Sequence, residues 1–498
     1  MPEILNGLGL TTEDTIALAN GLKPGTRNPT SAAVKTGITA ATTALGGYSL
    51  EAPAKSIYFI EDAMRRRIPR VVNPIGSDTA HWKVITAINS GKVKAGVAEG
   101  ALATALTMST APKSMAMRTL NQYNTFTDEA KVFGRRFMDI PNLGMLATLQ
   151  SEMIQEDRYI LGGVDVTIGG PTTVTAVDSG ATGTFAATGY YFVVSALTIH
   201  GWQNAAKGRI AGVDAADESI GTTANSGALT PTSLHGVTLS WTDVPGAFAY
   251  NIYCGTASFA AAVYIGTAYK NLVTLTSPTS YNGATTGTGV TNLADQTADQ
   301  YGYQGMIQQL TALTGTVGST GSYGTKTAYY LDNAGVAPTS DGAGGCVEIE
   351  TALQSIWNSW RAYPTMMLVN SQEAKSLKKL TIGSSSSNAV RINISQDDKN
   401  KFTAGSAVDT YYSPYAEQLI NIVTSVHCPP GKIMLLGERV PYPNAEAPNN
   451  FEVELQQEYY GEFFARTTRT TPVGVTCIGA LKIYAPGLNG IIANLAAA

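Results

Sequence analysis

Residues 451–486 read FEVELQQEYYGEFFARTTRTTPVGVTCIGALKIYAP. In 451–456, Phe, Val and Leu alternate with Glu, Glu and Gln, which is the period-2 pattern of a half-buried strand. In 475–483, Val475, Cys477, Leu481 and Ile483 repeat the same period. An aromatic cluster at 459–464 lies between the two runs. The stretch therefore predicts two long paired strands, and its residues are not arranged like a catalytic site.

The composition indicates a β-rich globular protein with several domains. The chain has 498 residues, of which 44% are hydrophobic and only 14% are charged, with 51 glycines. This length allows two to four domains with ample core. The net charge of -4 argues against a coat that binds nucleic acid mainly through counterion release.

The four cysteines are far apart and have no C-x-x-C spacing. This argues against a zinc or redox site and suits free thiols in a reducing cytoplasm. They are Cys254, Cys346, Cys428 and Cys477. We find no secretory signal pattern and no run of 18 apolar residues, so we expect no membrane partner.

Two groups of motifs resemble one known family. The first is EAPAK at 51–55 followed by RRRIPRV at 65–71, and the second is LQQEYY at 455–460, TTR at 467–469 and LKIYAPG at 481–487. These resemble the major capsid proteins of tailed bacteriophages (Caudoviricetes). The resemblance covers roughly 48–163 and 296–492. It implies an α+β fold with an N-terminal arm, an extended hairpin loop, a peripheral domain with a long spine helix, and an axial domain.

On this basis we divide the chain into seven segments. They are an N-terminal arm (1–47), the start of the peripheral domain (48–77), the extended hairpin loop (78–125), the spine helix (126–170), an inserted all-β sandwich (171–294), a mainly axial domain (295–440), and the C-terminal strands of the peripheral and axial domains (441–498).

The hairpin and the helix also have signals of their own. Two strand-like runs flank a polar centre at 88–101, and arms of roughly 18 residues would reach about 50–60 Å. Because this is longer than a compact body of this size is wide, we expect the hairpin to lie on a neighbouring subunit. In the helix, predicted from Thr127 to Gly163, an apolar stripe recurs at helical spacing: Leu143, Leu146, Leu149, Met153 and Ile160.

Composition changes abruptly in the inserted segment. Residues 171–294 hold eight charged side chains, and short alternating runs are separated by Gly, Thr, Ser and Pro. The run GVTLSWTDVPGAFAYNIYCG at 236–255 resembles immunoglobulin-like or fibronectin type III strands, and about 120 residues suit one β-sandwich. The predicted core residues are Tyr190, Phe192, Trp241, Tyr250 and Ile252. After the insertion, 346–377 reads as helix, strand, helix, with Met366–Val369 as a buried strand.

No pattern indicates an enzyme, a cofactor or a metal. The four histidines (His81, His200, His235 and His427) are isolated and lack metal-ligand spacing. Gly318, Gly321 and Gly324 precede Lys326 without the adjacency that a phosphate loop requires. The carboxylate pairs Glu152/Glu156 and Glu452/Glu454 are interpreted as the polar face of a helix and the outer face of a strand, in solvent or at an interface.

Charged residues are instead candidates for contacts between subunits. The densest basic cluster is at 65–70, where contact with packaged DNA is an alternative role. Some members of the resembling family cross-link a loop lysine to an asparagine of a neighbour, so Lys92 and Lys94 are also of interest. The candidates are Arg65, Arg66, Arg67, Arg70, Lys92, Lys94, Glu452, Glu454, Arg466 and Arg469.

The resemblance implies a structural protein of the virion, made in the host cytoplasm. Copies would assemble into pentamers and hexamers of an icosahedral shell around double-stranded DNA, with the sandwich on the outer surface, where a host-surface or glycan ligand could bind. A separate scaffolding protein and a portal are the expected partners, because 1–47 lacks a charged helical scaffold. The alternatives are an encapsulin-type nanocompartment shell and a secreted adhesive or carbohydrate-binding protein.

Overall fold

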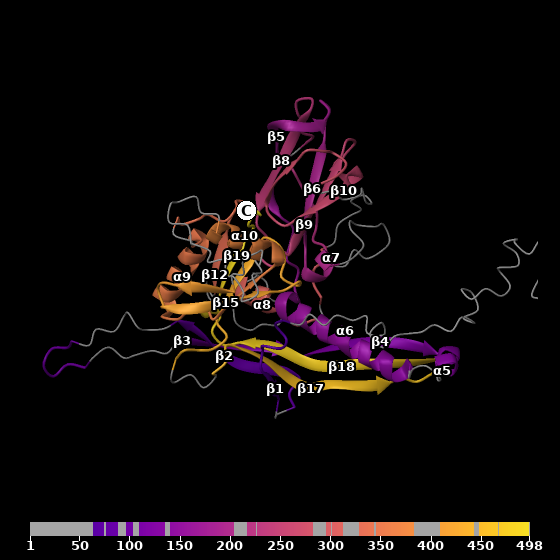
Figure 1. Cartoon of the computed structure of the whole chain (residues 1–498), viewed down its shortest axis with the longest axis vertical. Helices are drawn as coiled ribbons and strands as arrows, with labels where there is room; N and C mark the ends of the chain where they lie inside the picture. The colour runs from indigo at the N-terminus through magenta and orange to yellow at the C-terminus, as the bar shows by residue number, and fades with distance from the viewer. Residues whose placement is uncertain are drawn as a thin grey trace, which may run out of the picture. The chain divides into compact units, whose positions relative to one another are not determined.

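The computed structural model describes residues 63–73, 76–87, 96–102, 109–134, 140–203, 217–225, 227–281, 295–299, 301–311, 328–342, 345–382, 409–442, 448–466 and 468–497. The fold is mixed α+β, with several sheets and few helices (Figure 1). Within these residues, none of the helices has the length and apolar character needed to cross a membrane. The predicted arm at 1–47 lies outside them.

The two long strands predicted near the C-terminus are confirmed as neighbours in a four-stranded sheet. Their antiparallel register runs from Phe451 opposite Ile483 to Phe463 opposite Val473, with two bulges. The sheet has the order β1-β17-β18-β4. Its strands are β1 (Arg70–Val72), β17 (Phe451–Phe463), β18 (Thr470–Ile483) and β4 (Arg118–Thr127).

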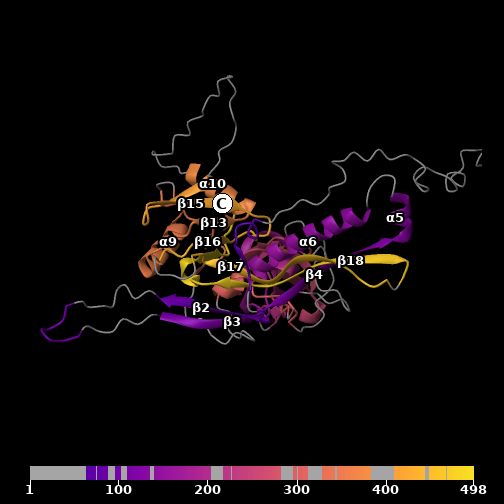
Figure 2. The same ribbon diagram turned by 90° about the horizontal axis from the view of Figure 1, so that it is seen from below.

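Two helices follow β4 in the segment that was predicted to be helical, namely α5 (Asp128–Gly134) and α6 (Ile140–Gly162). Both views show α6 running beside β4 and β18 (Figures 1 and 2). The five residues of the predicted apolar stripe do not form the buried face of α6, because Leu146 is exposed and only Ile160 is fully buried. The sheet side of α6 instead carries small residues and carboxylates, including Gly144, Glu152 and Glu156.

The predicted hairpin is shorter than 78–125 at its second arm. Strands β2 (Thr79–Ala87) and β3 (Ser109–Ala116) pair antiparallel as a two-stranded ribbon. Residues 118–125 belong to β4, which pairs with β18 over ten positions and so gains a sheet partner that the ribbon could not offer. Of the polar centre at 88–101, the structure describes 96–101.

Two further sheets enclose a separate apolar cluster and form what we call the two-sheet unit, residues 172–275 (Figure 1). The five predicted core residues, Tyr190, Phe192, Trp241, Tyr250 and Ile252, are buried in this cluster. One sheet has the order β10-β9-β6-β7 and the other β11-β8-β5. The strands are β5 (Thr172–Phe185), β6 (Tyr191–Leu197), β7 (Thr222–Thr223), β8 (His235–Thr242), β9 (Ala249–Gly255), β10 (Val263–Ala268) and β11 (Leu272–Leu275).

A six-stranded sheet with the order β12-β19-β16-β13-β15-β14 forms the last part of the fold. The predicted succession of helix, buried strand and helix is confirmed as α9 (Val347–Trp360), β13 (Met366–Val369) and α10 (Ser371–Ile382). The other strands are β12 (Tyr329–Asp332), β14 (Thr410–Ser413), β15 (Gln418–Thr424), β16 (Ile433–Leu436) and β19 (Gly490–Ala493). Short helical turns complete the fold: α7 (Ile199–Gln203), α8 (Met306–Thr311), η2 (Phe259–Ala261) and η3 (Pro486–Leu488).

The segment that connects α6 to the two-sheet unit lies beside the segment that follows the unit, at 299–305. Asp299 N donates to Val164 O at 2.8 Å, and Gly305 N donates to Gly163 O at 2.9 Å. A Cβ atom on Gly305 would lie 2.5 Å from both Gly163 N and Tyr159 O, which are backbone atoms. Glycine is therefore required here by a close approach of two backbones.

We predict that Gly305→Ala destabilises the protein by roughly 1–3 kcal/mol, because the backbone must shift to admit the methyl group. The measurement is the urea midpoint of unfolding. Gly227→Ala is the control, since a Cβ atom there meets nothing within 4 Å. Equal midpoints for the two variants would contradict the close approach.

Candidate functional site

Carboxylates on α6 hold the segment that precedes β1. Asp157 Oδ1 accepts hydrogen bonds from the backbone N–H of Met64 (3.0 Å) and of Arg65 (2.8 Å). Asp157 Oδ2 lies 2.7 Å from Nδ1 of His427, and both side chains are buried. One carboxylate thus fastens α6 both to this segment and to the loop that follows β15.

Glu156 lies one residue earlier and binds the side chains of the same segment. Its carboxylate accepts from Arg65 Nε at 3.0 Å and from Arg70 Nη2 at 2.5 Å. Tyr459 on β17 also donates to it, and both guanidinium groups lie about 5 Å from the Tyr459 ring centre, at 5.0 and 4.9 Å. Burial raises the pKa of Glu156, while the charges of Arg70 and Arg65 oppose that shift.

Glu152 lies one turn before Glu156 and has no such cation. Its side chain is fully buried, and Oε2 has no hydrogen-bond partner among the residues that the structure describes. Burial, and secondarily the charge of Glu156, raises the pKa of Glu152 to about 8. The Cys477 thiol on β18 donates to Oε1 of Glu152, with 3.9 Å between Sγ and Oε1.

The interpretation of Glu152 and Glu156 as a solvated polar face was therefore wrong. Because their side of α6 faces the sheet, both are buried, and guanidinium groups from another part of the chain compensate Glu156. Sequence reasoning did not find Asp157, His427 or Tyr459. The available signal was the density of arginines at 65–70, which needs an acidic partner but does not say where that partner lies.

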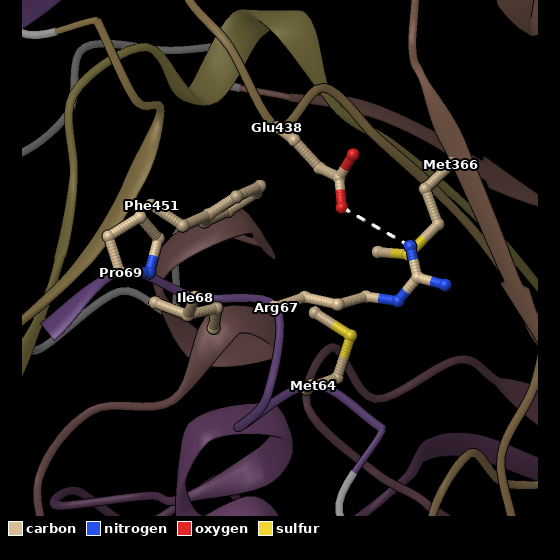
Figure 3. Close-up of a pocket in the computed structure, with 7 residues that line it drawn as sticks. All are labelled: Met64, Arg67, Ile68, Pro69, Met366, Glu438 and Phe451. Carbon is tan, nitrogen blue, oxygen red and sulfur yellow. Dashed lines mark ion pairs between the residues drawn. The ribbon is translucent and has the colours of Figure 1, made fainter.

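The remaining arginines of the cluster lie nearer the surface. Arg66 is exposed, and Arg67 lies 3.5 Å from Glu438 in a half-exposed ion pair. This pair borders a small hollow (Figure 3). The other lining residues are Met64, Ile68, Pro69, Met366 and Phe451.

The two predicted strand carboxylates also have partners within the chain. Glu454 is buried and forms an ion pair with Lys482 on the neighbouring strand, so its assignment to an outer, solvated face was wrong. Glu452 is partly buried and accepts from Tyr484 OH at 2.7 Å. The partners of both carboxylates thus lie on β18 or directly after it.

Arg466 and Arg469 lie in the exposed turn between β17 and β18 and pair with the first turn of α5. Arg466 pairs with Asp128, and Arg469 Nη2 lies 3.1 Å from Glu129 Oε1. Lys92 and Lys94 lie outside the described residues.

Apolar side chains are exposed at two ends of the fold. Around α5 and the β17–β18 turn, Phe133 is 77% exposed and Phe463 is 69% exposed, with Tyr123 and Val132 also exposed. Beyond the β2–β3 ribbon, Leu102 is 97% exposed. Exposed apolar patches mark interaction surfaces in soluble proteins, and the group around α5 and the β17–β18 turn is of this kind.

No family model and no curated protein matches the sequence. Similar solved structures include the capsid of an empty GTA particle computed with C5 symmetry (9% identity over 95% of this chain and 100% of that chain, TM-score 0.38). A structure from Mycobacterium phage Bobi is 7% identical over 92% of this chain and 97% of that chain, with a TM-score of 0.39. The holo-SrpI encapsulin complex from Synechococcus elongatus is 9% identical over 89% of this chain and 92% of that chain, with a TM-score of 0.34. These likenesses are distant, with scores below 0.5.

We predict that Glu156→Gln lowers the free energy of unfolding by roughly 3 kcal/mol, because two largely buried guanidinium groups lose their counter-charge. Chemical denaturation measures the change. Glu129→Gln is the matched control, since its ion pair with Arg469 is exposed and contributes at most about 1 kcal/mol. A loss at Glu156 no larger than at Glu129 would show that the cluster is not a stabilising anchor.

The buried Glu152 predicts stability that falls as pH rises. The folded state keeps its proton up to a pKa of about 8, whereas the unfolded state releases it near the ordinary glutamate pKa of 4.5. Between these values the unfolded state binds fewer protons, so the free energy of unfolding decreases with pH, by at most about 1.4 kcal/mol per unit.

Glu152→Gln removes this dependence, and we expect its advantage over the native protein to grow from pH 5 to pH 8. Urea midpoints at several pH values test this. Parallel pH profiles for the two proteins would mean that Glu152 is ionised in the folded state.

Proposed function

We propose that this protein is a shell-forming major capsid protein, whose copies assemble into the pentamers and hexamers of an icosahedral particle around double-stranded DNA. The motifs at 51–71 and 455–487 support it, because they resemble the tailed-phage family at both ends of the body. The exposed apolar ends of the described surface support it independently. No catalytic role is assigned to any residue.

The observation that carries the proposal is the pair of exposed apolar ends, at Leu102 beyond the ribbon and at Phe133 and Phe463 near the β17–β18 turn. A two-stranded ribbon is marginally stable alone, and Leu102, which lies beyond its described strands, is exposed. Two surfaces on one chain allow each copy to engage different neighbours. Each contact can then be of standard size, about 800 Å² per partner. A copy bound at one surface binds more readily at the other, so the whole shell dissociates more slowly than any single contact.

We narrow the set of proposed inter-subunit residues by the exposure of their charged groups. Arg65, Arg70 and Glu454 are engaged inside the chain, so their charges are not offered to a neighbour. Arg66, Arg67, Arg466 and Arg469 have exposed or half-exposed side chains and remain the proposed contacts, with Glu452 at the strand margin. Lys92 and Lys94 remain proposed through the resemblance alone.

The two-sheet unit is proposed as an inserted immunoglobulin-like sandwich on the outer surface of the shell, since an inward unit would displace packaged DNA. Its low charge suits close packing of many copies and is compatible with a neutral glycan or host-surface ligand. A separate scaffolding protein and a portal are the proposed partners, and the virion is the proposed location.

Electron microscopy of the protein purified from its native source tests the proposal. We expect closed icosahedral particles with external knobs and nuclease-protected double-stranded DNA. Particles that hold a protein cargo and no DNA would favour an encapsulin-type compartment. Monomers or small oligomers alone would argue against a shell.

A substitution tests the carrying observation directly. Leu102→Asp should leave the urea midpoint unchanged, because the side chain is exposed, and should reduce the yield of particles at least tenfold. The control is Leu234→Asp, which changes an exposed leucine of the two-sheet unit that the proposal places away from contacts. Equal particle yields for both variants would remove the ribbon end from the assembly surface.

A further inference from the structure

The two-sheet unit meets the six-stranded sheet at a set of polar side chains, of which Asn271 and Asn494 are buried, Asp243 and Tyr330 are partly buried and Asp332 is exposed. We call this set the junction cluster: Asp243, Asn271, Tyr330, Asp332 and Asn494. Asp243 and Asn271 come from loops of the two-sheet unit that follow β8 and β10. Tyr330 and Asp332 lie on β12, and Asn494 directly follows β19.

Asp243 is the centre of the junction cluster. Its Oδ1 accepts from Asn494 Nδ2 at 2.7 Å and from Tyr250 OH, within its own unit, at 2.8 Å. Its Oδ2 accepts from Tyr330 OH. Three donors thus converge on one carboxylate, and two of them belong to the opposite side of the junction.

Asp332 makes the reciprocal contact from the six-stranded sheet. Its Oδ2 accepts from Asn271 Nδ2 of the two-sheet unit at 3.0 Å. Its Oδ1 accepts from Asn494 Nδ2 at 2.8 Å, so one amide bridges both carboxylates. Asn494 has a positive φ of 57°, a conformation that asparagine tolerates better than most residues.

Close backbone contacts surround these polar groups. Gly431 and Gly335 both have positive φ, and a Cβ atom on them would lie 2.7 Å from Tyr269 O and 2.6 Å from Leu272 Cβ, respectively. The fully buried side chain of Lys432 crosses the junction and donates to the carbonyl of Ala247. Sliding of the two sides past each other would disturb these close contacts and break the Lys432 hydrogen bond.

Relative motion is the default for units joined only by linkers. Here the two connecting segments, which hydrogen-bond to each other through Val164 and Asp299 and through Gly163 and Gly305, form one attachment of the two-sheet unit to the body. The junction cluster forms a second attachment on different elements. Rotation about the first would leave the buried amide groups of Asn271 and Asn494 without their carboxylate acceptors, which costs the desolvation free energy of those groups. Two attachments therefore fix the orientation of the two-sheet unit, whereas a single attachment would allow it to rotate.

We propose that the junction cluster is a rigid coupling that fixes the orientation of the two-sheet unit relative to the six-stranded sheet. The coupling is a property of the single chain and does not depend on assembly. If the proposed function is correct, it would also give every copy in a particle the same orientation of this unit.

Distance measurements between spin labels test the coupling in the full chain. Labels at Thr274→Cys on β11 and Gln418→Cys on β15 occupy exposed positions, and the four native cysteines are buried. Dilution with unlabelled protein restricts the signal to pairs within one chain. We expect a single narrow distance distribution, which Asp243→Ala broadens at least twofold.

Two further variants make the outcome decisive. Asn494→Gly removes the bridging amide, suits the positive φ, and should broaden the distribution even if Asp243→Ala does not fold. Asp178→Ala is the control, because Asp178 accepts from Gly180, Thr232 and His235 entirely within the two-sheet unit and should leave the width unchanged. A broad distribution in the native protein, or unchanged widths in both junction variants, would overturn the proposal.

Discussion

The contact between the α6 carboxylates and the segment at 64–70 is the constraint on which the rest of the body depends. Asp157 binds two backbone amides of that segment, and Glu156 binds two of its guanidinium groups. This arrangement determines where the chain turns into β1, and hence where β1 pairs with β17. Tyr459 and His427 attach the same helix to β17 and to the loop after β15. One helix face thus sets the positions of parts that lie hundreds of residues apart in sequence.

Burying three carboxylates on one face is not an efficient way to gain stability, because desolvation opposes the attraction between charges. An apolar face would pack against many partners with little discrimination. Charges instead require particular donors in particular places, and this requirement selects one arrangement of α6 and the segment at 64–70. Glu152 has no paired cation among the described residues, and burial favours its neutral form.

Local patterns predicted the elements whose neighbours are close in sequence. The alternation at 451–456 and 475–483 predicted β17 and β18, and the run at 346–377 predicted α9, β13 and α10. The face of α6 could not be predicted in this way, because Glu156 and Arg70 are 86 residues apart and only the folded chain brings them together. The end of the hairpin was misplaced for a similar reason. Residues 118–125 have strand character, but nothing local shows that their partner is β18, hundreds of residues later. The exposed ends at Leu102 and Phe463 likewise become visible only once burial is known.

The side-by-side chains at the base of the two-sheet unit bear on how the molecule folds. Gln304 Nε2 donates to Asp165 at 2.9 Å, although the two residues are 139 positions apart. Closing a flexible loop costs more entropy as the loop grows, and α8 must find α6 across this distance. If the two-sheet unit folds early around its own core, its ends are already adjacent, and a long loop becomes a short and stiff one. The search that joins the two halves of the body would then be shortened by the very segment that separates them.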